Sequence, residues 1–155
     1  KKSKGKNYLK PKSEKLITDF RQVIEPYKYI DLDAEFGVVM GFSVYKKFID
    51  DTLIPLSQGQ LKYDDLYDLS KEEHVLHLEW ELNGKLWSEK LDVQSDYIDG
   101  KIFTLVNRVL KDVGIPNKFI PFHESGHGTD FILGYFDPVD QVNFNKVSSV
   151  YVIES

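Results

Sequence analysis

The sequence has no cysteine, and this absence removes several kinds of chemistry. Without a thiol the chain has no disulfide framework, no cysteine nucleophile and no cysteine-ligated zinc site. Glycine-rich phosphate loops and the G-x-S-x-G nucleophile motif are missing as well. The sequence therefore favours a protein that is not an enzyme and that needs no cofactor.

Long apolar runs are also missing. The longest nearly uninterrupted one, residues 36–45, is about half of the ~20 residues that a membrane-spanning helix needs, so no membrane span is predicted. Aromatic residues do not alternate with basic ones as they do in single-strand nucleic-acid binders, because the tyrosines lie among acids. Nucleic acid is therefore not expected as a partner.

What the chain does have is the composition of a packed globular protein. Its 155 residues are 41% hydrophobic, 29% charged and 14% aromatic, which is enough to bury one core without a disulfide or a structural metal. Two independent domains would each be marginal at this length. We expect residues 13–155 to form a single globular domain behind a basic, flexible N-terminal arm, residues 1–12.

The net charge of −5 conceals an asymmetry along the chain. Residues 1–15 hold seven lysines and one acid, net +6, which leaves a net charge of −11 for residues 16–155. Such an acidic body repels nucleic-acid backbones and favours basic partners, whereas the segment from Lys1 to Lys15 could touch an anionic surface. The chain does not begin with methionine, so a processed or trimmed N-terminus is expected.

The clearest structural pattern is a β-hairpin. Residues 74–82 alternate between apolar and polar side chains with the period of a half-buried strand. One face would carry Leu76, Leu78, Trp80 and Leu82, and the other His77, Glu79 and Glu81. Asn83-Gly84 suits a type I′ turn, after which residues 85–93 return with Trp87, Leu91 and Val93 on one face. The polar face of this hairpin could meet water or a partner.

Helical periodicity marks three other segments. Residues 14–25 have apolar side chains at helical spacing after the possible cap Ser13, and residues 97–113 do so between Asp96 and Gly114. Residues 33–53 match a helical stripe that Pro55 would end, although their glycines and β-branched residues also suit a strand; helix is favoured.

Further strands are predicted over residues 118–122, 130–136 and 147–153, and a polar acidic connection over residues 57–73. Strands therefore gather in the second half of the chain around one long helix. This arrangement predicts an α+β fold, with a mainly antiparallel sheet of four to five strands and two or three helices packed on one face.

One motif suggests metal chemistry. His123-Glu124-Ser125-Gly126-His127 matches H-E-x-x-H, in which one helical turn brings two histidines to zinc beside a glutamate base. A helix is disfavoured here because Pro121 precedes the motif and glycines lie within and after it. The flanks look like hairpin strands with the motif at their turn, so no metal site is predicted. A zinc hydrolase using His123, Glu124 and His127 remains an alternative.

An acidic stretch that contains tyrosines is the best candidate for partner binding. Tyrosine supplies rigid contact area and carboxylates supply electrostatic steering, a combination suited to a basic protein surface. The predicted binding residues are Tyr63, Asp64, Asp65, Tyr67, Asp68, Glu72 and Glu73.

These observations favour a non-enzymatic, acidic binding protein that engages a basic protein partner. In its small size, acidity and lack of cysteine the chain is similar to bacterial toxin-immunity proteins, a similarity that implies a toxin as partner. A membrane-associated domain, held at a surface through residues 1–15 beside a lost anchor, is the first alternative. A cytoplasmic location is favoured slightly over an extracytoplasmic one with a removed signal.

Overall fold

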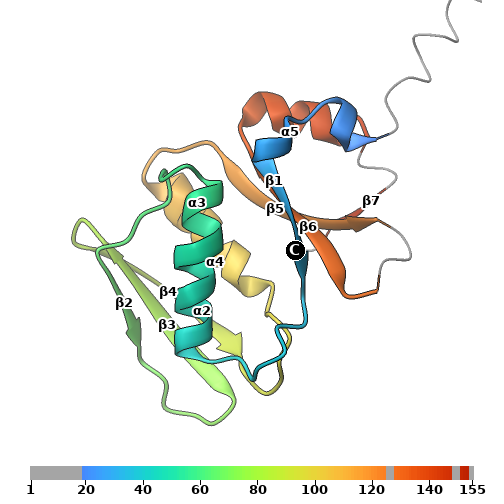
Figure 1. Cartoon of the computed structure of the whole chain (residues 1–155). Coiled ribbons are helices and arrows are strands. Elements are labelled where there is room, and N and C mark those ends of the chain that lie inside the picture. The colour runs from blue at the N-terminus through green and yellow to red at the C-terminus, as the bar shows by residue number, and fades with distance from the viewer. Residues whose placement is uncertain (1–18, 125–127, 148–150, 154–155) are drawn as a thin grey trace, which may run out of the picture.

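The computed structural model describes residues 19–124, 128–147 and 151–153 (Figure 1). The helical elements in chain order are η1 (Phe20–Gln22), η2 (Pro26–Lys28), α2 (Phe42–Phe48), the π-helical η3 (Ile49–Leu53), α3 (Ile54–Leu56), α4 (Lys101–Asp112) and α5 (Pro138–Asn145). The strands are β1 (Tyr29–Asp33), β2 (Asp65–Asp68), β3 (Val75–Leu82), β4 (Lys85–Asp92), β5 (Lys118–Glu124), β6 (Asp130–Phe136) and β7 (Tyr151–Ile153). The fold is an α+β mix.

The strands form two antiparallel sheets rather than the single predicted sheet. The first sheet has the order β1-β6-β5-β7, and the second has the order β2-β3-β4. Within the first sheet Tyr29 lies opposite Gly134, so a strand from the start of the chain pairs with one more than a hundred residues later. Strands β1 and β2 were not predicted, and both lie at sheet edges.

The predicted hairpin is confirmed by the register of β3 and β4. Leu82 pairs with Lys85 across a two-residue turn in which Asn83 has φ +53° and Gly84 has φ +78°. Both values fall in the left-handed region that a type I′ turn requires. Leu76, Leu78 and Trp80 are buried, as their alternation predicts.

Strand β6, one of the two inner strands of the first sheet, is buried on both of its faces. Leu133 and Tyr135 belong to a large apolar cluster that contains α4, part of α2 and the inner side of β3 and β4. Ile132 and Phe136 point the other way, into a smaller cluster with residues from η1 and α5. Helices therefore lie on both faces of this sheet, and the prediction that they pack on one face is not confirmed (Figure 1).

The helical prediction for residues 33–53 is confirmed only from Phe42 onward. The helix then continues beyond the predicted end at Pro55, because a π-helical turn precedes the proline. In that turn the N–H of Ile54 donates to the carbonyl of Ile49, five residues back. A proline ring inside a regular α-helix clashes with the carbonyl group four residues earlier. The wider π-helical turn gives the backbone before Pro55 more room.

The other two predicted helices differ from the structure in their boundaries. In the described part of residues 14–25 there is only the short η1, capped by Asp19, and Ser13 and the predicted arm lie outside the described residues. The long helix α4 begins at Lys101, where Asp99, not Asp96, accepts a hydrogen bond from the Lys101 N–H at 3.0 Å. Its predicted end is confirmed, since Gly114 has φ +88°.

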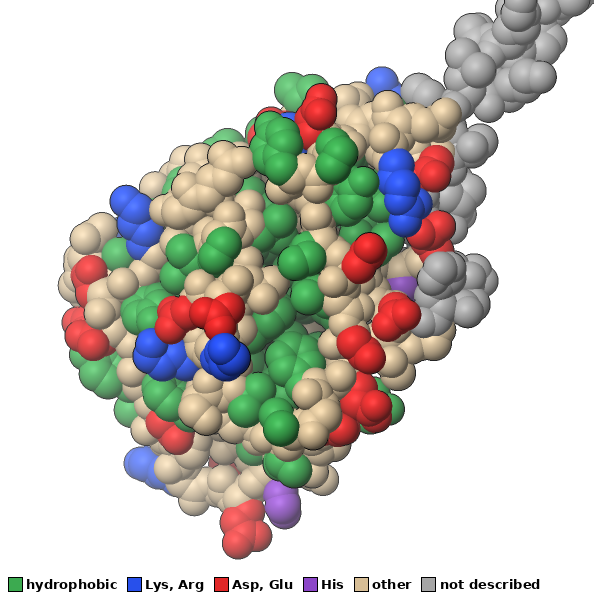
Figure 2. Space-filling model, in the orientation of Figure 1, with side chains coloured by type: hydrophobic (Ala, Val, Ile, Leu, Met, Phe, Trp, Pro, Cys, Tyr) green, Lys and Arg blue, Asp and Glu red, His purple; other side chains and the backbone are tan. Residues whose placement is uncertain are grey.

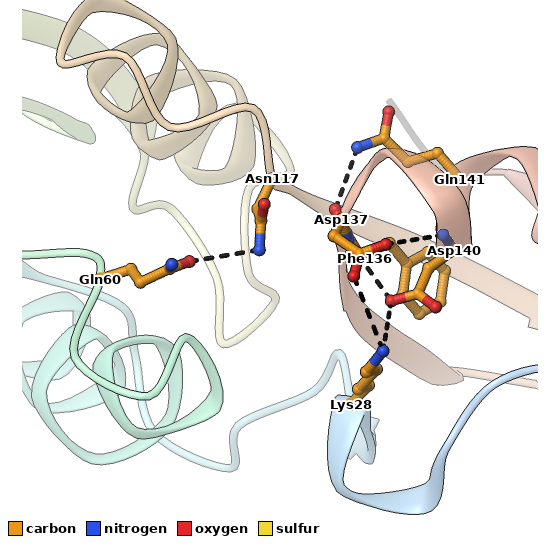
Figure 3. Close-up of polar contacts among 7 residues, drawn as sticks. All are labelled: Lys28, Gln60, Asn117, Phe136, Asp137, Asp140 and Gln141. Carbon is orange, nitrogen blue, oxygen red and sulfur yellow. Dashed lines mark hydrogen bonds and ion pairs between the residues drawn. The ribbon is translucent and has the colours of Figure 1, made fainter.

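Helix α5 was not predicted, and a polar network ties it to η2 (Figure 3). The Lys28 ammonium donates to Asp140 at 2.8 Å and lies 3.8 Å from Asp137. Asp137 and Asp140 form a reciprocal capping box at the start of the helix. Asp140 is only 6% exposed, so its ion pair with Lys28 and its cap hydrogen bonds compensate for the burial of the carboxylate. No helix in the described part of the chain is long and apolar enough to cross a bilayer.

Candidate functional site

The outer face of the β2-β3-β4 sheet carries an acidic surface. Even-numbered residues of β3 point into the core, so the odd-numbered ones point outward with their partners on β2 and β4. The acidic sheet face is defined by Asp65, Tyr67, Glu79 and Glu81. Asp65 and Tyr67 belong to the predicted binding residues and the two glutamates to the predicted polar face of the hairpin, and the structure brings the four together.

The register of this face places like charges opposite each other. Asp65 pairs with Glu81 across the β2–β3 ladder, a juxtaposition that destabilises a sheet. Tyr67 reaches diagonally, and its hydroxyl donates to the Glu81 carboxylate at 2.7 Å. Within the described residues no lysine or arginine forms an ion pair with Asp65, Glu79 or Glu81. The face therefore holds unneutralised negative charge.

The titration of Tyr67 reports this charge. Its pKa is raised to about 12, mainly by the hydrogen bond to Glu81 and further by desolvation and the charge of Asp65. The side chain is nevertheless 38% exposed. At neutral pH Tyr67 is therefore a protonated, accessible aromatic group surrounded by carboxylates.

Two of the predicted binding residues have structural roles at one end of β2. The Tyr63 hydroxyl donates to Asp50 at 2.7 Å and accepts from Lys46 at 2.9 Å, and its ring packs edge-on against Trp80. Asp64 accepts a hydrogen bond from the Asn83 N–H at 2.8 Å and so fixes the hairpin turn. Their side chains also line a surface hollow of about 730 Å³.

The remaining three are Asp68, the last residue of β2, and Glu72 and Glu73, which lie beyond it. Asp68 accepts hydrogen bonds from Ser70, and Glu72 lies 3.8 Å from the Lys90 ammonium. Asp68 and Glu72 line a second hollow of about 440 Å³, whereas Glu73 is almost fully exposed. The seven predicted residues therefore follow one edge of the sheet, but only Asp65 and Tyr67 belong to its acidic face.

A separate carboxylate cleft of about 440 Å³ lies on the first sheet. Asp31 and Asp33 of β1, Glu124 of β5 and Asp130 of β6 line it, and Arg21 reaches Glu124 at 2.9 Å. Figure 2 shows carboxylates gathered over β1 and the start of β6. This grouping was not predicted, because strands that are distant in the sequence bring the four carboxylates together.

The first two residues of the H-E-x-x-H motif, His123 and Glu124, lie in a strand and not in the helix that a zinc peptidase uses. His123 and Glu124 are consecutive residues at the end of β5, where side chains alternate between faces, and His127 lies outside the described residues. The required helix is thus not formed at the motif's first two positions. Among the residues that the structure describes, no group of three or more side chains is placed to hold a metal ion.

No protein-family model matches the chain, and no curated protein or solved structure matches it either. Function is therefore inferred from the residues of the site themselves. The segment from Lys1 to Lys15, on which a membrane-surface role would depend, lies outside the described residues.

Proposed function

We propose that the chain is a non-enzymatic binding protein whose acidic sheet face engages a basic protein partner. The observation that carries the proposal is the cross-strand pair Asp65–Glu81, two carboxylates that face each other without a cation among the described residues. The repulsion between the two carboxylates in the unbound protein is relieved when a lysine or arginine of a partner lies between them. A toxin neutralised by its immunity protein is one partner of this chemistry.

The same face offers the apolar contact that protein interfaces need in addition to charge. Tyr67 presents a ring held in place by its hydrogen bond to Glu81, and such a ring loses little conformational entropy on binding. Leu86 lies opposite Glu81 on β4 and is 58% exposed. An aromatic and an aliphatic side chain thus flank the carboxylates. Charge would steer the partner, and these two groups would contribute contact area.

The size of the face indicates how far the partner must extend. Strands β3 and β4 have eight residues each and β2 has four, so at about 3.3 Å per residue and about 4.8 Å between strands the face covers roughly 320 Å². A standard interface buries about 800 Å² on each partner. The partner must therefore reach past the sheet onto its flanks, where Asp64, Asp68 and Glu72 lie. The wider predicted set would form the rim of the interface.

Substitutions that replace carboxylates with amides on two different surfaces test the proposal. The full chain, an Asp65→Asn/Glu81→Gln variant and a matched Asp31→Asn/Asp130→Asn variant are each used to capture partners from the native host. Both variants lose two negative charges, so they differ only in where the charge is removed. We expect a basic protein to be retained by the chain and by the carboxylate-cleft variant and lost by the sheet variant.

Calorimetry with the captured partner then measures the interaction. We expect the dissociation constant to rise at least tenfold in the sheet variant and the wild-type affinity to fall steeply with salt. Capture of no protein, or equal affinity in the two double variants, would overturn the proposal. The product of the neighbouring gene is the first purified candidate to titrate, because a toxin gene lies beside that of its immunity protein.

A further inference from the structure

A groove of about 730 Å³ lies where α4, the start of β5 and the end of α5 meet. Phe103, Asn107 and Lys111 line it from one face of α4, since residues four apart share a helical face. Lys118 and Ile120 line it from β5, and Phe144 closes it from α5. The phenylalanines are buried and Ile120 is half-buried, so the groove has an apolar floor.

The charged side chains that line this groove all have the same sign. Every charged side chain in its lining is basic, namely Arg108, Lys111 and Lys118. In four other hollows on the described residues the lining includes at least one carboxylate. The whole chain has 25 acidic and 20 basic residues. A groove whose charged lining residues are all basic is therefore positioned to attract an anion.

The three cations are not equally available. Arg108 donates to the Ser88 carbonyl at 2.6 Å and lies 3.5 Å from Glu89, so it is committed to β4. Lys111 and Lys118 are exposed, and neither forms an ion pair with another part of the described chain. A bound anion would therefore meet these two ammonium groups.

The N–H and the carbonyl of Phe119 at the groove's base already have hydrogen-bond partners within the protein. The Asn107 amide donates to the Phe119 carbonyl at 2.9 Å and accepts from the Phe119 N–H at 2.8 Å. Two residues further on, Pro121 has no N–H to offer. A peptide strand would therefore find no open ladder here, which leaves apolar contact and charge as the means of recognition.

We propose that this groove binds an amphipathic anion, an aliphatic chain that ends in a carboxylate. The chain would lie over Ile120 and the apolar floor, and the carboxylate would meet Lys111 and Lys118. This site is independent of the acidic sheet face and of its protein partner. Charge complementarity selects the anion, and the absence of carboxylates from the lining excludes a cationic amphiphile.

The test uses the full chain and dodecanoate below its micellar concentration. Methyl NMR follows Ile115 and Ile120, both of which line the groove, while dodecyltrimethylammonium and acetate serve as ligands with only the tail or only the charge. We expect saturable shifts with dodecanoate and none of comparable size with the other two. Binding of both long-chain compounds with equal affinity would show a non-selective apolar surface and would overturn the proposal.

Paired lysine variants locate the charge. Replacing Lys111 and Lys118 with glutamine should weaken dodecanoate binding about tenfold, since two partly exposed ion pairs are lost. A matched control replaces Lys85 and Lys101, exposed lysines outside the groove, and should bind as the unaltered chain does. Unchanged affinity in the Lys111/Lys118 variant, as binding through the lysine-rich segment 1–15 would give, overturns the proposal. Far-UV circular dichroism confirms that each variant is folded.

Discussion

Asn107 hydrogen-bonds both peptide groups of Phe119 and so supplies the contacts that a neighbouring strand would make. Among the described residues β7 pairs with β5 only from Phe122 onward, and no described strand lies beside the first part of β5 on that side. The side-chain amide of Asn107 supplies one donor and one acceptor to this edge. Together with Pro121 it closes an edge that could otherwise recruit a strand from another molecule.

Loss of this amide should destabilise the fold. Asn107→Ala leaves the N–H and the carbonyl of Phe119 without their partners at a partly buried edge, and we expect a loss of about 1–3 kcal/mol in the free energy of unfolding. Urea denaturation measures it. Thr104→Ala, an exposed position on the same helix, should change stability by less than about 0.5 kcal/mol. Equal effects of the two substitutions would contradict the role given to Asn107.

Gly134 is required by a ring that lies against it. A Cβ atom built on Gly134 would overlap the ring of Phe136, which is fully buried. Gly134→Ala should therefore cost about 1–3 kcal/mol through overpacking. A Phe136→Leu background removes the ring edge, so there the same substitution should cost much less. Thermal unfolding of the four proteins gives the coupling, and additive effects would rule out the contact as the cause.

The pKa of Tyr67 should depend on Glu81 and not on Glu79. Glu81 accepts the phenol hydrogen bond, so Glu81→Gln should lower the pKa of Tyr67 from about 12 toward its ordinary 10.0. Glu79 lies directly opposite Tyr67 in the register but makes no such bond, so Glu79→Gln should leave the pKa nearly unchanged. A pH titration of the Tyr67 ring resonances distinguishes the two. Similar shifts in both variants would mean that diffuse charge, and not this bond, sets the titration.

Tyr45 should make stability fall at alkaline pH. Burial raises its pKa to about 12 from 10.0, so the folded state favours the neutral phenol. Its contribution is complete below pH ~10 and is lost as pH rises from ~10 to ~12, up to about 2–3 kcal/mol. Tyr45→Phe also removes the acceptor for the Asp99 N–H, 2.9 Å away, and should cost about 1–2 kcal/mol at neutral pH.

The same variant provides the check on this pH dependence. Urea denaturation at neutral pH and at several values between ~10 and ~12 should show a smaller alkaline loss for Tyr45→Phe than for the unaltered chain. Parallel curves for the two proteins would assign the loss to other groups. Tyr135, whose pKa burial also raises to about 12, contributes equally to both curves.

The sequence predicted those elements whose signals are local. The β3–β4 hairpin is determined by alternation and by the Asn83-Gly84 turn, and the end of α4 by Gly114. The division of the strands into two sheets could not be predicted, because β1 pairs with β6, a strand about a hundred residues later in the chain. Helix α5 buries only Asp140 and Phe144 and so shows no apolar stripe, although Asp137-Pro138 was an available start signal.

The candidate site was predicted in part for the same reason. The acidic tyrosine stretch identified Asp65 and Tyr67, but a four-residue strand that contains two aspartates has little β propensity of its own. It becomes a strand by pairing with β3, and that pairing sets Asp65 against Glu81. Predicting the acidic sheet face would have required the register, which depends on tertiary contacts.

Strand β6 also links the unfolding of the two apolar clusters. Its alternate side chains enter two separate apolar clusters, so neither cluster can be exposed without removing support from the other. The two clusters should therefore open together in one cooperative event. The amides of Ile132 to Tyr135 should be among the slowest to exchange with deuterated solvent, at rates that report global unfolding.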